Sequence, residues 1–175
     1  MSPADENEAI AMTKAAYAHN GPVYMRFGRS NVPNYHADNM EFVIGKGDVL
    51  KDGADVAIIA NGLLVYKAMV AAAELEEMGI HAMVINMATI KPLDEALVLE
   101  AAEKCGRIIT CEEHSIVGGL GEAVCSCLSE KKPTPVRRIG VNDVFGYSGP
   151  ANDLLKEFGL SAEHIVEVAK DFCGK

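Results

Sequence analysis

The pattern of apolar and polar positions changes near residue 55. From there on, short continuous apolar runs alternate with longer segments whose apolar residues recur every three or four positions. The short runs predict buried strands and the longer segments predict amphipathic helices. The predicted strands are residues 56–61, 81–86, 107–113 and 135–141, and the predicted helices are residues 63–78, 93–104, 120–128, 151–158 and 162–172. This alternation indicates an α/β fold with three αβα layers, a Rossmann-like, mostly parallel sheet with helices on both faces.

The first 54 residues follow a different pattern. Ser2-Pro3-Ala4-Asp5 predicts a helix start, with serine as the cap and proline in the first turn, and Asn20-Gly21 ends the helix. Residues 22–27 predict a short strand, and the glycine-containing residues 28–54 predict an irregular linker with an edge strand or hairpin. One helix and one strand cannot build a core, so residues 1 to about 30 resemble the last piece of another domain.

Composition and charge exclude several classes of protein. The chain has 175 residues and a net charge of −9, which argues against nucleic-acid or anionic-membrane partners, since both require clustered lysine and arginine. No apolar run approaches the ~20 residues of a membrane span, and the acidic N-terminus does not resemble a signal peptide. The five cysteines contain no C-x-x-C pair and predict free thiols in a reducing compartment. We therefore expect a cytoplasmic protein.

The stretch from residue 108 to 124 reads as strand, loop and helix, and it contains the most distinctive glycines. Gly118, Gly119 and Gly121 precede the helix, but four residues separate them from Glu113, so the spacing of a dinucleotide-binding turn is missing. Glycines at such a position also permit close packing against a neighbour. We expect an interface loop here.

Four further groups each have a functional and a structural interpretation. Glu112, Glu113 and His114 could act as acid–base groups or metal ligands, or could make a polar contact with a partner. Arg26 and Arg29 could hold a phosphate or form surface ion pairs. The last two groups are the turn at Asn61-Gly62, which could bind an anion or only water, and residues 142–149, which are typical of a packed interface.

The order of these motifs resembles a known family. The sequences KPLD (91–94), EEHSIVGGLG (112–121), DVFGYSG (143–149) and LLKEFGLSAEHI (154–165) are similar to the C-terminal domain of transketolase, of 1-deoxyxylulose-5-phosphate synthase and of the β parts of 2-oxoacid dehydrogenases. The N-terminal residues PVYMRFGRSNVP (22–33) look most like a transketolase, at the end of its pyrimidine-binding domain. The resemblance implies that residues 1–45 are the tail of that domain plus a linker, and that residues 46–175 are the C-terminal domain.

The resemblance also implies an activity. Transketolases bind thiamine diphosphate with Mg²⁺ or Ca²⁺ between the subunits of a homodimer and move two-carbon ketol units between sugar phosphates, as in the pentose phosphate pathway. In this family an arginine at the position of Arg29 contacts the substrate phosphate. The family's catalytic and metal-binding residues belong to parts that this sequence does not contain. We therefore expect no catalytic residue, metal ligand or bound cofactor in this chain alone, whose role would be assembly with an N-terminal section or subunit.

Three alternatives remain open. The chain could be the corresponding part of the synthase or of a 2-oxoacid dehydrogenase β subunit. It could also be a regulatory module that binds a nucleotide or anion at one of its glycine turns. The contacts of the loop containing Glu113, His114, Gly118, Gly119 and Gly121 would separate the assembly role from the regulatory one: packing favours an interface, and free backbone N–H groups favour an anion site.

Overall fold

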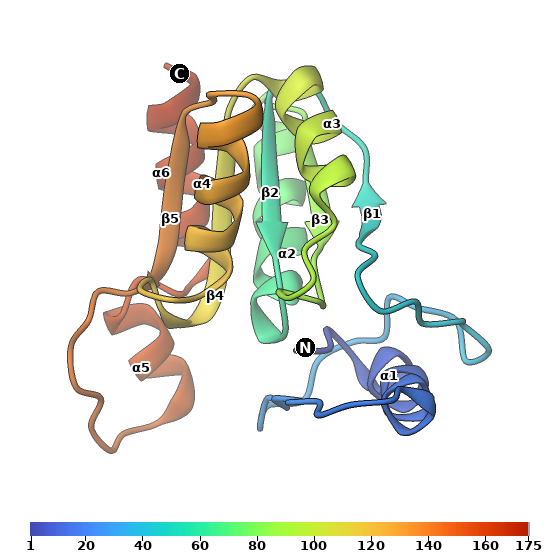
Figure 1. Cartoon of the computed structure of the whole chain (residues 1–175). Helices are drawn as coiled ribbons and strands as arrows, with labels where there is room; N and C mark the ends of the chain where they lie inside the picture. Colours follow the sequence, from blue (N-terminus) through green and yellow to red (C-terminus); the bar gives the residue numbers. More distant parts are fainter. Residues whose placement is uncertain (175) are drawn as a thin grey trace.

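The computed structural model describes residues 1–174 and contains one five-stranded sheet. Its order is β1-β3-β2-β4-β5, with β1 antiparallel to β3 and the other pairs parallel. The strands are β1 (Asp48–Lys51), β2 (Val56–Ala60), β3 (Ala82–Asn86), β4 (Ile108–Ser115) and β5 (Val136–Val141). The α/β class and the mostly parallel sheet are thereby confirmed (Figure 1).

Helices cover both faces of the sheet. Since successive strand residues point to opposite faces, each face contributes its own set of apolar side chains to a cluster with the helices. One apolar cluster joins Ile58 and Val84 to helices α2 and α6, and the other joins Ile59 and Ile85 to α3 and α4. The helices are α1 (Glu6–Ala18), α2 (Leu63–Glu77), α3 (Glu95–Cys105), α4 (Leu120–Lys131), α5 (Ala151–Glu157) and α6 (Ala162–Cys173). Burial of both faces explains why β2 and β3 are apolar at nearly every position.

The N-terminal region differs from the prediction in two places. The cap of α1 is Asp5, whose side chain accepts from the backbone N–H of Glu8, whereas the N–H of Ser2 donates to Ala88. Residues 22–27 form no strand, so that prediction is wrong. The backbone bonds recorded for this segment are with Met1, and a strand needs a neighbouring strand along its length. The predicted edge strand is confirmed as β1.

The connections create a reversal of strand order at β2. The chain passes from β2 to β3 on one side and then returns to β4 on the other side. In open parallel sheets, ligands bind beyond the carboxyl ends of the strands at such a reversal. The parallel strands run toward the side of the molecule that holds α1 and α5, so the crevice lies there (Figure 1).

Candidate functional site

A cavity of about 440 Å³ lies beyond the carboxyl ends of β2 and β4. Its walls come from the turn after β2, the loop before α3, the loop after β4 and the N-terminal segment. The polar and charged residues of the lining include His19, Arg26, Asn61, Lys91, Glu112 and His114. The fold thus builds a cavity at the strand reversal, where a ligand site would be expected.

The N-terminus of α4, at the edge of this cavity, is already occupied by a carboxylate of the chain itself. Glu112 is 2 % exposed, and its two oxygens accept from the backbone N–H groups of Leu120 and Gly121, both at 2.8 Å. A Cβ on Gly119 would lie 2.0 Å from Oε2 of Glu112, so only glycine leaves room for the carboxylate. A bound phosphate would need the same N–H groups.

The rest of this loop is tied locally. The N–H of Gly118 donates to Glu122, and His114 is exposed with its Nδ1 3.0 Å from the carbonyl oxygen of Ser115. A Cβ on Gly121 would lie 2.9 Å from side-chain atoms of Thr110 and Arg138. The loop therefore borders a cavity, yet the N–H groups of Gly118, Leu120 and Gly121 already donate to carboxylates of the chain itself. That arrangement does not favour an anion site.

The second candidate anion turn, at Asn61-Gly62, lies beneath the N-terminal segment. A Cβ on Gly62 would lie 2.7 Å from Oγ of Ser2, and the N–H of Asn61 donates to the carbonyl oxygen of Cys111. The start of α2 is thus covered by residues 2–3. Here too the close approach explains the glycine without a ligand.

Arg29 lies in a different cavity, which has a volume of about 710 Å³. Arg26, Ser30 and Glu113 line it on one side, and the opposite wall belongs to residues 146–160 around α5. Arg29 itself is exposed, so its guanidinium is accessible to a solute. Arg26 and Arg29 therefore line the same cavity. Of the residues predicted for the interface loop, Glu113 lines this cavity too, whereas His114 and the three glycines do not.

The described lining of the cavity at the strand reversal lacks the groups that thiamine diphosphate requires. A bound diphosphate with its divalent cation needs free oxygen ligands from the protein. The lining of this cavity holds one carboxylate among the described residues, Glu112, and both of its oxygens cap α4. Among the described residues, the lining holds one Phe, Tyr or Trp side chain, that of Tyr24. These residues do not fit the cofactor.

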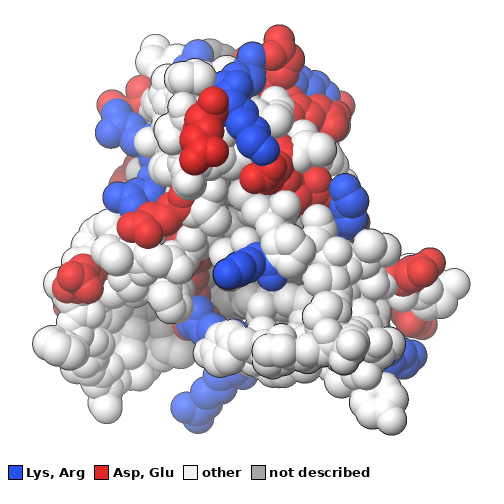
Figure 2. Space-filling model, in the orientation of Figure 1, with Lys and Arg blue, Asp and Glu red and all other residues white. Residues whose placement is uncertain are grey.

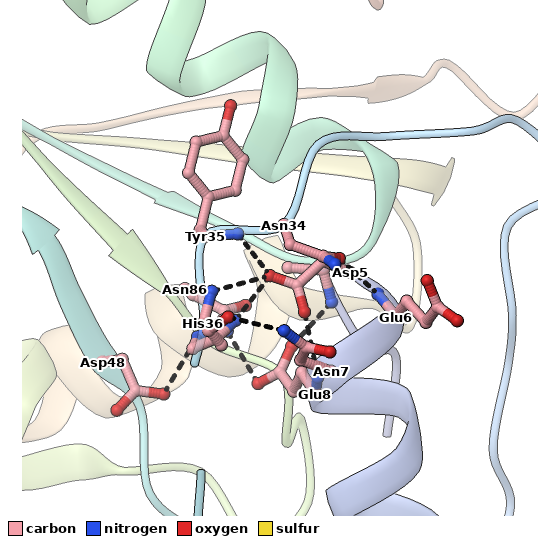
Figure 3. A network of polar contacts seen from close by, with 10 residues as sticks. Asp5, Glu6, Asn7, Glu8, Asn34, Tyr35, His36, Asp48 and Asn86 are labelled. Carbon is pink, nitrogen blue, oxygen red and sulfur yellow. Dashed lines mark hydrogen bonds and ion pairs between the residues drawn. The ribbon is translucent and has the colours of Figure 1, made fainter. Parts of the chain in front are cut away.

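A buried polar network, which the sequence analysis missed, joins α1 to the sheet (Figure 3). Asp5 accepts from the backbone N–H groups of Glu8, Tyr35 and His36. Oε2 of Glu8 accepts from the N–H of Ala4 at 2.6 Å, and its Oε1 accepts from the side-chain amide of Asn86 on β3 at 2.7 Å. Residues from α1, the following loop and β3 thus share one set of bonds.

Two carboxylates face the imidazole of His36 in this network. Its Nδ1 lies 2.7 Å from Oδ2 of Asp5, and its Nε2 lies 3.8 Å from Oδ2 of Asp48 on β1. The Asp48 carboxylate, opposed by burial and aided by Asp5, raises the pKa of His36 to about 9. Burial raises the pKa of Glu8, which is fully buried. The sequence analysis used Asp5 only as part of a helix start and placed His36 in a linker, so the spacing along the chain held no signal for this cluster.

Charge is distributed unevenly over the surface. On the face that Figure 2 shows, most Lys, Arg, Asp and Glu side chains lie over the upper part of the molecule, whereas the visible surfaces of the two lower lobes, which hold α1 and α5 in Figure 1, carry fewer of them. Exposed apolar side chains of the N-terminal segment and of the loops after β4 and β5 include Tyr24, Phe27, Val117, Phe145 and Tyr147. Among residues 1–174, no helix is both long and apolar enough to span a membrane.

Comparison with known proteins identifies the family of the chain. Residues 45–165 match the family described as transketolase, C-terminal domain. The chain is 43% identical over 169 residues to a 6-deoxy-6-sulfo-D-fructose transketolase subunit of Clostridium sp. (strain MSTE9), covering 97% of the chain and 52% of that subunit. It is 42% identical over 176 residues to 1-deoxy-D-xylulose-5-phosphate synthase 1 of Geobacter sulfurreducens, covering 98% of the chain and 28% of the synthase.

A solved structure supports the same assignment. A split gene transketolase, described as an inactive beta4 tetramer, superposes with a TM-score of 0.93 at 47% identity, over 97% of this chain and 55% of that one. The chain thus spans about half the length of the transketolase subunits that it matches. From its sequence, its sheet and these relatives, the chain belongs to the transketolase C-terminal domain family.

Proposed function

We propose that this chain is the C-terminal part of a thiamine-diphosphate-dependent transketolase, which transfers a two-carbon ketol unit between sugar phosphates. The main support is that it aligns along nearly its whole length with a transketolase subunit, while spanning about half of that subunit. In this proposal residues 1–45 are the tail of a pyrimidine-binding domain and its linker, and residues 46–175 are the C-terminal domain. The remaining domains hold the thiamine diphosphate and its Mg²⁺ or Ca²⁺.

The role of the chain itself is assembly. The N-terminal segment and the loops after β4 and β5 carry exposed apolar residues, and Phe145 is 99 % exposed. Exposed apolar patches mark interaction sites. This surface packs against the N-terminal section or subunit of the same enzyme and supports a homodimer. The loop with Glu113 and His114 lies at its border.

Arg29 is the substrate contact in this proposal. It lies with Arg26 and Ser30 around a cavity that is open to a sugar phosphate, and a guanidinium can hold a phosphate through two parallel hydrogen bonds. The sugars themselves stay undefined, since the relative from Clostridium is named for 6-deoxy-6-sulfo-D-fructose. The pentose phosphate pathway and a cytoplasmic location stay predictions, the latter supported by the unbridged thiols of Cys105, Cys111, Cys125 and Cys127.

The experiment has two arms. Calorimetric titration of the chain alone with thiamine diphosphate and Mg²⁺ should give no binding heat, and a micromolar isotherm would overturn the proposal of an incomplete enzyme part. Sedimentation velocity should show self-association that rises with concentration. Phe145→Ser should weaken it at least tenfold, and Met78→Ser, at an exposed apolar position at the C-terminal end of α2, is the control. A chain that stays monomeric at high concentration would contradict the assembly role.

Of the alternatives, the synthase has support from the sequence identity of 42%. A complete enzyme that forms 1-deoxy-D-xylulose 5-phosphate and transfers no ketol unit from a sugar phosphate would decide for it. The regulatory anion module is disfavoured by the bonds of Glu112 with the start of α4. A 2-oxoacid dehydrogenase β subunit has no specific observation in its favour.

A further inference from the structure

We propose that Glu8, His36 and Asp48 form a binding site for a single divalent transition-metal ion, with Zn²⁺ as the ion that fits best. One potential ligand atom of each residue lies within 4.8 Å of the other two. The site is distinct from the cavity at the strand reversal, because none of its three residues lines that cavity. It is also independent of the transketolase activity proposed above.

The orientation of His36 is the first argument. Its Nδ1 is 2.7 Å from a carboxylate oxygen of Asp5, and since an ionised carboxylate only accepts, Nδ1 carries the hydrogen. Nε2 points away from Asp5 and toward Asp48 (Figure 3). Histidines that bind metals are oriented in this way, with one ring nitrogen held by a carboxylate and the other free for the ion.

The burial of Nε2 is the second argument. The His36 side chain is 9 % exposed, and its Nε2 is a buried atom without a hydrogen-bond partner within the described chain. Buried polar nitrogens are normally paired, because leaving one unpaired costs free energy. The side-chain oxygen Oδ1 of Asn86, also in this network, is likewise buried and unpaired. An ion beside Nε2 would give this nitrogen the partner that the described chain does not supply.

The oxygen ligands can reach an ion beside Nε2. Asp48 Oδ2 lies 3.8 Å from Nε2, and the Asp48 side chain is half exposed, so it can move inward and leaves an entry path from solvent. Glu8 is held by single bonds from Ala4 and Asn86, and each of its oxygens keeps another lone pair. Bonds to zinc are about 2.0–2.2 Å long, so the three groups need to close around the ion by a modest side-chain movement.

The balance of charge also favours a cation. Three carboxylates, those of Asp5, Glu8 and Asp48, surround one imidazole. No lysine or arginine in the part of the chain that the structure describes forms an ion pair with any of the three. Buried negative charge is costly unless it is paired or coordinates a metal. With its pKa of about 9, His36 carries one positive charge at neutral pH, and a divalent ion at Nε2 would displace that proton and bring more positive charge to the carboxylates.

The ligand set selects the kind of metal. Mg²⁺ and Ca²⁺ prefer oxygen ligands alone, whereas imidazole nitrogen combined with carboxylates suits Zn²⁺ and its transition-metal neighbours. Glu8 comes from α1, Asp48 comes from β1, and His36 comes from the loop between them. An ion bound there would therefore fasten the N-terminal segment to the edge of the sheet.

The test is a Zn²⁺ titration of the metal-free full chain by calorimetry, repeated with Co²⁺ and followed by visible absorption. We expect one Zn²⁺ per chain, a rise in melting temperature and no comparable binding of Mg²⁺. His36→Asn keeps an amide donor near the Nδ1 position but removes the ligand at Nε2, and it should weaken Zn²⁺ binding at least tenfold. Asp48→Asn should do the same, and His81→Asn, an exposed histidine beside Glu76, should not.

The outcomes separate this site from others. Because Asp48 is half exposed, Asp48→Asn is expected to fold and decides the matter even where His36→Asn does not fold. Absence of Zn²⁺ binding to the parent chain would overturn the proposal, and so would equal affinity in Asp48→Asn and the parent. A thiolate charge-transfer band with Co²⁺ at one equivalent would assign the ion to a cysteine and would also overturn it.

Discussion

The N-terminal segment (residues 1–45) and the sheet domain (residues 46–174) are held by different forces. The sheet domain buries two apolar clusters, one against each face of the sheet. In the N-terminal segment the buried hydrophobic residues besides Pro3 are Ala4 and Met12, while Asp5 and Glu8 are buried and hydrogen-bonded. Apolar packing is not directional and is roughly proportional to area, whereas buried polar bonds depend on every partner being present. The two regions should therefore respond differently to mutation.

The largest effect is expected in the sheet domain. Ile58 lies in the centre of β2 and is fully buried, so Ile58→Ala should lower the free energy of unfolding by about 2–5 kcal/mol through lost burial and a cavity. Urea denaturation followed by circular dichroism measures it. Ile58→Val, which removes one methylene, should cost about 0.5–1.5 kcal/mol. Equal losses in the two variants would show that the cluster adapts by repacking.

The next effect concerns function rather than stability and lies in the N-terminal segment. In the reconstituted enzyme, Arg29→Ala should raise KM for phosphorylated sugars, because a hydrogen bond to a charged group contributes about 1.5–3 kcal/mol. Steady-state kinetics measure it, with Arg26→Ala as the neighbouring control, for which we expect a smaller change. Unchanged kinetics in Arg29→Ala would remove this residue from the substrate site.

The polar network should break locally. Glu8→Ala leaves the amide of Asn86 and the N–H of Ala4 without their acceptor, and a buried unpaired donor costs about 1–3 kcal/mol. Hydrogen exchange should become faster in residues 1–36 and stay unchanged in β2 and β4. Glu6→Ala, at an exposed position of the same helix, is the control. A uniform rise in exchange across the sheet would show that the two regions unfold as one unit.

The smallest effect is expected at the α4 cap. Gly119→Ala places a methyl group where the Glu112 carboxylate lies, and displacing this cap should cost about 0.5–2 kcal/mol. Thermal unfolding measures it. Gly146→Ala, where a Cβ meets nothing within 4 Å, is the control and should change little. A Gly119→Ala protein as stable as the parent would mean that Glu112 can cap the helix from another position.

Sequence periodicity was sufficient for the sheet domain but not for the N-terminal segment. The apolar runs at 56–61 and 81–86 predicted β2 and β3 within one residue, because buried parallel strands are apolar at every position. Residues 22–27 have the composition of a strand, yet strand formation depends on a partner that no local pattern reveals. The side chains of Asp5, His36 and Asp48 meet although they lie 31 and 12 residues apart along the chain, and only the folded chain brings them together.

The carboxylate of Glu112 has a consequence for protein engineering. The crevice of this domain has the layout of a phosphate-binding fold, but the chain supplies its own anion at the helix start. To give the domain a nucleotide site, an engineer would have to delete an acid rather than add a base. Glu112→Ala would free the backbone N–H groups of Leu120 and Gly121 beside a cavity of about 440 Å³. A single substitution would thus convert a domain whose own carboxylate occupies the helix start into one whose helix start is free to bind an anion.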